Sequence, residues 1–135
     1  MTTWLSTHGI GAIKDSASTF VINMVSGSAI VKPTTANQLT GWVHFTIPSP
    51  PVDNPDLKNL TVKFSSQSAT VESVLVYLAN SKVFEDSNLQ YTGSFDLDIA
   101  STKAVYQGNG IAVSIKVVFT SVTGTLTFQS VGIQV

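Results

Sequence analysis

Two side chains that could bind a ligand stand two positions apart in the segment GWVHFTI, which covers residues 41–47. Every second residue of this segment is hydrophobic, and Trp42 and His44 occupy the positions between them. This alternation predicts a strand with Trp42 and His44 on the face opposite the core. An indole can stack on a sugar ring or anchor a protein interface, and an imidazole can donate or accept a hydrogen bond.

Two interpretations of this Trp42/His44 face stay open. In the first, the N-terminal segment, which carries Trp4 and His8, or a second chain covers the face. In the second, the face is an open platform for a ligand. Because the chain has few charges, we favour a covered face over a wet face that exposes an indole.

Carboxylates are the other candidates for a site. Asp96 and Asp98 leave the same face of a predicted strand, about 7 Å apart, and Asp53 and Asp56 lie in the proline-rich loop 48–59. Calcium prefers loops with several oxygen ligands, so these four residues are the candidate calcium ligands. Alternation alone already explains Asp96 and Asp98 as the solvated side of a strand, and we therefore predict no cofactor, with calcium as the alternative. A second polar loop is expected around Glu85, Asp86 and Asn88.

Several classes of function are excluded by residues that the chain lacks. There is no cysteine, which rules out disulfides and thiolate metal sites. A Ser-His-acid triad would need one of the two histidines, and no nucleophile-elbow, phosphate-loop or dinucleotide motif is present. The net charge is −1 and all positive charges are lysines, which argues against nucleic-acid binding. The sequence thus predicts that the protein is not an enzyme and does not bind nucleic acid.

The elements that position these residues are short runs of β-branched residues between turn-forming residues, a pattern typical of all-β domains. Strands are predicted at residues 18–25, 29–32, 39–47, 60–64, 69–79, 94–100, 111–119 and 124–135. A shift of the apolar phase between Phe128 and Val131 predicts a bulge, and Asn109–Gly110 is a hairpin-type turn signal. We predict a jelly-roll-like antiparallel β-sandwich that forms a single domain over residues 1–135.

The predicted core consists of the inward members of these alternating strands. They are Phe20, Ile22, Val43, Phe45, Ile47, Leu60, Val62, Phe64, Val74, Val76, Phe95, Leu97, Ile99, Val113, Ile115, Val117, Phe119, Leu126 and Phe128.

The first residues have neither a basic start nor a continuous apolar run, so no signal peptide is predicted. No run is long enough for a membrane helix. The sequence leaves the location open between the cytoplasm and export by an unrecognised route.

Four short motifs resemble those of a family of short, uncharacterised bacterial proteins of about this length. The matching residues are Trp4, His8 and Gly9; His44, Phe45, Ile47, Pro48 and Pro50; Val74, Val76 and Tyr77; and Leu126, Thr127, Phe128 and Gly132. The chain departs from the family pattern by lacking arginine and by its Ser/Thr-rich first third. The resemblance implies a β-sandwich of unknown function and transfers no catalytic residue.

These observations predict a non-catalytic binding or structural module that self-associates through a sheet face or edge. The C-terminal strand 124–135 carries no charge, and strand edges are normally protected by charge, proline or bulges. That strand or the Trp42/His44 face is therefore the expected contact between chains in a homo-oligomer. The alternative is a lectin-like domain that binds a glycan through inter-strand loops, with or without calcium.

Overall fold

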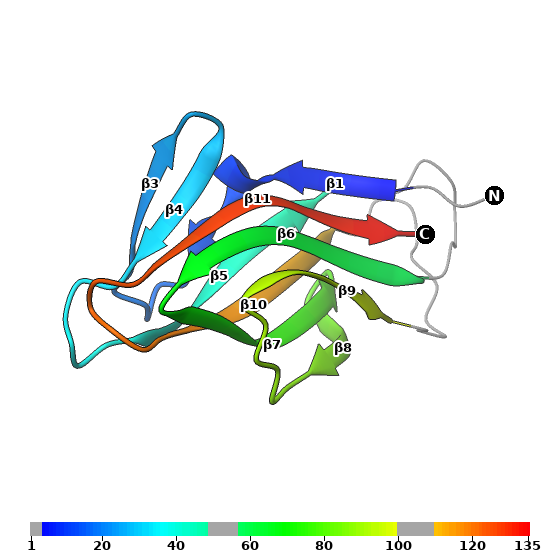
Figure 1. Cartoon of the computed structure of the whole chain (residues 1–135). Helices are drawn as coiled ribbons and strands as arrows, with labels where there is room; N and C mark the ends of the chain where they lie inside the picture. The colour runs from blue at the N-terminus through cyan, green and yellow to red at the C-terminus, as the bar shows by residue number, and fades with distance from the viewer. Residues whose placement is uncertain (1–3, 49–56, 100–109) are drawn as a thin grey trace.

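The computed structural model describes residues 4–48, 57–99 and 110–135, and within them it shows two antiparallel sheets packed face to face (Figure 1). The predicted all-β, jelly-roll-like sandwich is confirmed. The six-stranded sheet has the order β3 (Val21–Val25), β4 (Ser28–Lys32), β11 (Thr125–Gln134), β6 (Asn59–Gln67) and β9 (Gly93–Asp98), with β1 (Trp4–His8) paired to β11. The five-stranded sheet has the order β2 (Ile13–Lys14), β5 (Thr40–Ile47), β10 (Ile111–Phe119), β7 (Ala69–Leu78) and β8 (Ser81–Asp86).

The core lies between the two sheets and follows the predicted alternation. Every residue of the predicted core is buried except Ile22, which is partly buried on the edge strand β3. Phe45 of the five-stranded sheet meets Phe128 of the six-stranded sheet edge to face, with ring centroids 5.0 Å apart. This geometry suits the charge distribution of aromatic rings and joins the two layers.

Strand β11 contains the predicted bulge, because its pairing with β6 shifts register between Phe128 and Ser130. After the shift, Val131 and Ile133 are fully buried. Strand β11 pairs with β6 on one side and with β4 and β1 on the other. The expectation that this C-terminal strand offers an open edge to a second chain is therefore wrong: it lacks charges because it lies inside the sheet.

The N-terminal segment crosses from one sheet to the other, which the sequence did not predict. It runs through β1, the 3-10 helix η1 (Gly9–Gly11) and β2. A Cβ atom on Gly9 would lie 2.0 Å from the backbone oxygen of Phe128, so only glycine lets this crossing pack on β11.

Strand β8 is a second element that the sequence analysis missed. Glu85 and Asp86, expected in a loop, belong to β8. Asp53, Asp56 and the Asn109 turn position lie outside the described residues. No helix in the described ranges is long and apolar enough to cross a membrane.

Candidate binding face of the five-stranded sheet

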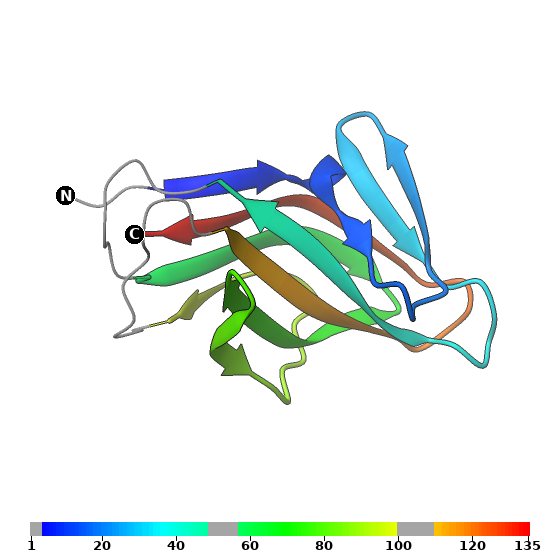
Figure 2. The same cartoon turned by 180° about the vertical axis from the view of Figure 1, so that it is seen from behind.

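Trp42 and His44 lie on the outer face of the five-stranded sheet, which Figure 2 shows from its own side. In β5, half-buried Trp42 and His44 alternate with fully buried neighbours, so their predicted outward orientation is confirmed. In the ladder with β10, Trp42 is opposite Lys116 and His44 is opposite Ser114. The indole is thus neither fully covered nor fully open.

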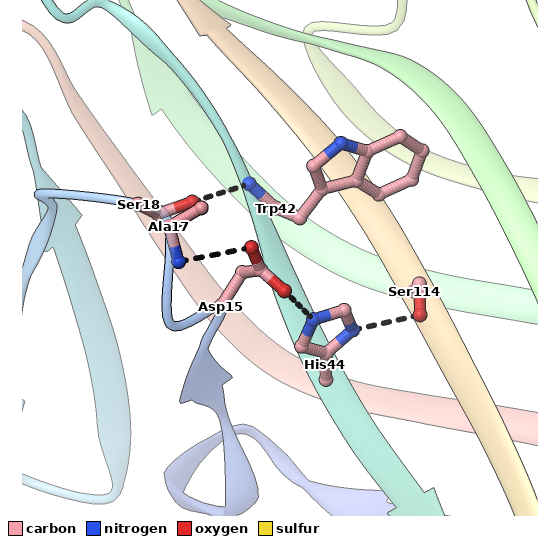
Figure 3. Close-up of polar contacts among 6 residues, drawn as sticks. All are labelled: Asp15, Ala17, Ser18, Trp42, His44 and Ser114. Carbon is pink, nitrogen blue, oxygen red and sulfur yellow. Dashed lines mark hydrogen bonds and ion pairs between the residues drawn. The ribbon is translucent and has the colours of Figure 1, made fainter.

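His44 is held on both ring nitrogens (Figure 3). Its Nε2 lies 2.8 Å from Oδ1 of Asp15, and its Nδ1 lies 2.7 Å from Oγ of Ser114. A carboxylate only accepts hydrogen bonds, so Nε2 carries a proton and donates to Asp15. In the neutral ring, Nδ1 then accepts the hydroxyl proton of Ser114. The imidazole has one fixed orientation on the sheet surface.

Two hydrogen bonds hold the turn that supplies Asp15 against β5. The Asp15 N–H donates to the Trp42 carbonyl at 3.0 Å, and the Trp42 N–H donates to Ser18 Oγ at 3.0 Å. The Ala17 N–H donates to Oδ2 of Asp15 at 3.2 Å. The hydrogen bond from His44, and after it the one from Ala17, lowers the pKa of the Asp15 carboxyl below its ordinary value. We call Asp15, His44 and Ser114 the latch.

The latch contains the residue types of a hydrolytic triad, but its geometry does not suit nucleophilic attack. Ser114 is only 4% exposed and lies in the middle of β10. Its backbone is in register with His44 on one side and Leu75 on the other, inside two ladders. A serine nucleophile needs an accessible Oγ and free N–H groups beside it for the oxyanion. The latch therefore positions the side chain of His44.

Beyond Trp42, the face becomes polar. Lys116 Nζ lies 3.6 Å from Glu72 Oε1. Beside this pair, a hollow of about 290 Å³ is lined by Thr70, Glu72, Asn88, Leu89, Gln90 and Val118. Farther along β7, the half-buried side chains of Leu75 and Tyr77 lie opposite Ser114 and Ala112 of β10 and add a second apolar area to the face. The arrangement offers an aromatic surface next to amide, carboxylate and ammonium groups.

Trp4 and His8 lie elsewhere. Both are on β1 of the six-stranded sheet, where Trp4 is opposite Gln134 and is 49% exposed. His8 Nδ1 accepts the Ile10 N–H at 3.2 Å and caps η1, which is a structural role. The expected packing of Trp4 and His8 against Trp42 and His44 is not formed, because the two pairs lie on different sheets. Instead, Ile13 and Lys14 pair with β5, and the side chains of Asp15 and Ser18 bond to His44 and to the Trp42 backbone.

Of the four acidic candidates, Asp96 and Asp98 belong to the described residues, and Asp53 and Asp56 lie outside them. Asp96 and Asp98 are exposed on β9, as their alternation predicted. Residues 4–48, 57–99 and 110–135 contain no group of three or more His, Cys, Asp or Glu side chains that could hold a metal ion.

Sequence reasoning missed Asp15, Ser114, Lys116 and Glu72. A signal existed for Ser114 and Lys116, because they are the polar residues at the outward positions of IAVSIKVVF. No local pattern pairs Asp15 with a histidine 29 positions away.

Comparisons with known proteins bear on the fold. No protein-family model matches the chain, and no curated protein matches it. Its structure is similar to a xylan-binding module, CBM86, from Roseburia intestinalis, with TM-score 0.62 and 12% identity over 97% of this chain and 94% of that chain. It is also similar to a family 29 carbohydrate-binding module from Piromyces equi, with TM-score 0.56 and 6% identity over 98% of this chain and 90% of that chain.

An enzyme shares the architecture as well. A Stig cyclase from Fischerella sp. TAU is similar with TM-score 0.51 and 12% identity, over 80% of this chain and 62% of that chain. Likeness at such low identity shows the fold alone, and function has to be argued from the site.

Proposed function

We propose that the chain is a non-catalytic carbohydrate-binding module whose ligand lies across the outer face of the five-stranded sheet. The observation that carries the proposal is the half-buried indole of Trp42 beside a histidine fixed by the latch and next to the Lys116–Glu72 pair. The fold shared with two carbohydrate-binding modules supports it. The partner of the Trp42/His44 face is then a glycan and not a second chain.

The chemistry of the face suits a sugar chain. An indole face offers an apolar surface to the C–H groups of a pyranose ring. Hydroxyl groups of the sugar find donors and acceptors in Lys116, Glu72, Asn88 and Gln90 at the hollow. Because the latch already fixes the imidazole, less side-chain entropy is lost on binding.

The extent of the aromatic surface favours an oligosaccharide over a single sugar. Tyr77 is opposite Ala112 on β10, and Ala112 is opposite Thr46 on β5. Trp42 and Tyr77 are thus two strands and four residues apart, or about 17 Å at ordinary sheet spacings. A linear chain of several sugar rings would span both aromatic side chains.

The experiment is affinity gel electrophoresis and calorimetry with xylan, glucomannan and soluble cellulose derivatives. We expect at least one of them to bind and Trp42→Ala to weaken that binding at least about tenfold, equal to 1.4 kcal/mol. The matched control is Trp4→Ala, which removes the exposed tryptophan of the other sheet and should leave binding unchanged.

Folding of the variants is checked by urea denaturation. A fully buried tryptophan would cost about 3–5 kcal/mol on truncation, and for half-buried Trp42 we expect about half of that. If Trp42→Ala is too unstable to assay, Glu72→Gln serves as the second variant. Absence of binding to every polysaccharide, or equal loss in Trp42→Ala and Trp4→Ala, would contradict the proposal.

A further inference from the structure

Strand β3 is an edge strand, and within the described residues it pairs only with β4. The two strands form a hairpin at one end of the sandwich (Figure 1). Its turn is Ser26–Gly27, and both residues have positive φ, 49° and 78°. Positive φ at both central positions is the signature of a two-residue type I′ turn.

The edge of β3 lacks the usual protection against pairing. Strand β9, at the other edge of the six-stranded sheet, and strand β8, at one edge of the five-stranded sheet, both carry charged residues. Strand β3 has the sequence VINMV, with no charge and no proline. Its Val21, Met24 and Val25 side chains are 43%, 49% and 52% exposed. Such an edge is a template for another β-strand.

The geometry of the hairpin determines which backbone groups of β3 have no hydrogen-bond partner in β4. In a two-residue hairpin the residues that flank the turn, here Val25 and Ser28, form a hydrogen-bonded pair. Bonded and non-bonded pairs then alternate, so Asn23 and Val21 also direct their backbone groups toward β4. The backbone N–H and C=O groups of Ile22 and Met24 point toward the open edge.

We propose that two copies of the chain pair through β3, antiparallel, around a two-fold axis at Asn23. In this register, Ile22 of each copy is opposite Met24 of the second copy, and the pair exchanges both backbone hydrogen bonds. The free groups of the edge are thereby satisfied by the same groups of its copy. Such self-complementarity is what a two-fold interface requires.

A hollow beside β3 fits the side chain that this register brings to it. It has a volume of about 360 Å³ and is lined by Ala12, Lys14, Phe20, Val21 and Ile22. Opposed residues of a pair project to the same face, so Met24 of the second copy would lie next to Ile22 at the hollow. An unbranched thioether adapts well to an irregular space, and here it would contact the apolar side chains of Phe20, Val21 and Ile22.

Because the chain has no cysteine, a single cysteine can report on the axis. Cα atoms of a non-hydrogen-bonded antiparallel pair lie about 4.5 Å apart, within reach of a disulfide. We expect Asn23→Cys to form a disulfide-linked dimer under mild oxidation, at least about tenfold faster than Asn80→Cys. Asn80 is the matched control, an exposed asparagine in the β7–β8 turn.

The second measurement is sedimentation equilibrium of the native chain over a concentration series. We expect a dimer whose dissociation constant rises at least tenfold in Met24→Lys and is unchanged in Val122→Lys, since Val122 is 45% exposed outside the hairpin. A monomer at all concentrations overturns the proposal, as does a dimer that Met24→Lys leaves intact. Equal cross-linking of Asn23→Cys and Asn80→Cys also overturns it. None of these readouts depends on glycan binding.

Discussion

The hydrogen bond between His44 and Asp15 in the latch has a strength that can be measured. We would combine Asp15→Ala and His44→Ala in a double-mutant cycle and measure the free energy of unfolding by urea denaturation at pH 7. The cycle isolates the contact between the carboxylate and the imidazole from the other losses of each variant.

The magnitude follows from the exposure of the two side chains. His44 and Asp15 are 35% and 33% exposed, so solvent screens the pair. We therefore expect a coupling free energy of about 0.5–1 kcal/mol, in the upper part of the roughly 0.2–1 kcal/mol that solvent-exposed pairs contribute. His44→Ala alone should cost more, roughly 2–3 kcal/mol, because it also leaves the buried hydroxyl of Ser114 without its partner.

The coupling should depend on pH with a definite sign. The hydrogen bond from His44 lowers the pKa of Asp15 in the folded state. A lowered carboxyl pKa contributes stability above the unfolded value, near pH 4, and that contribution is lost as the pH falls through the folded value. The unfolding free energy of the native chain should therefore fall more than that of Asp15→Ala between pH 5 and about pH 2.

Two results would refute this reasoning. One is a coupling free energy within about 0.2 kcal/mol of zero at pH 7. The other is an identical loss of stability in both proteins across the acid range. Either would mean that the contact between Asp15 and His44 has no energetic weight in solution.

Two further predictions concern the packing of η1 and calcium. Gly9→Ala should lower the free energy of unfolding by about 3 kcal/mol or more in urea denaturation, because the added Cβ would meet backbone atoms of Phe128. The control Gly93→Ala, whose Cβ would have no atom within 4 Å, should change it by no more than about 0.5 kcal/mol. Similar values for both variants would show that η1 does not pack as described. If Asp53, Asp56, Asp96 and Asp98 are merely solvated, millimolar calcium should leave the melting temperature unchanged. A melting temperature that rises with calcium and falls again with EDTA would restore the calcium-dependent lectin, because a bound ion adds about 2.7 kcal/mol to the free energy of unfolding at a hundredfold excess over its dissociation constant.

Most of the sandwich could be predicted because alternation reports directly which side of a strand is buried. Val43, Phe45 and their equivalents are inward for that reason alone. Alternation does not reveal a strand that has no fully buried side chains or that has only two residues. In β1 no residue is fully buried, and β2 has only two residues, both exposed, so neither produces a periodic signal.

The position of a strand within its sheet could not be predicted. An uncharged strand is equally expected at a self-associating edge and at a central position, and β11 proved central because it pairs on both sides. Whether β11 or β3 forms the edge depends on long-range pairing, which local composition does not encode. For the same reason the Trp42/His44 face could be located, but its contact with Asp15 could not.

The two proposed contact regions use different parts of the sandwich, and this separation has a consequence. Strand β3 belongs to the six-stranded sheet, whereas Trp42 and the latch lie on the outer face of the five-stranded sheet. Pairing through β3 uses the backbone hydrogen-bonding groups of an edge strand. In each copy it leaves the outer face of the five-stranded sheet free. A dimer of this kind would present two glycan-binding faces at once. Because a polysaccharide repeats its binding unit, the second contact would be intramolecular, and modest affinity at each Trp42 would add up to a higher avidity.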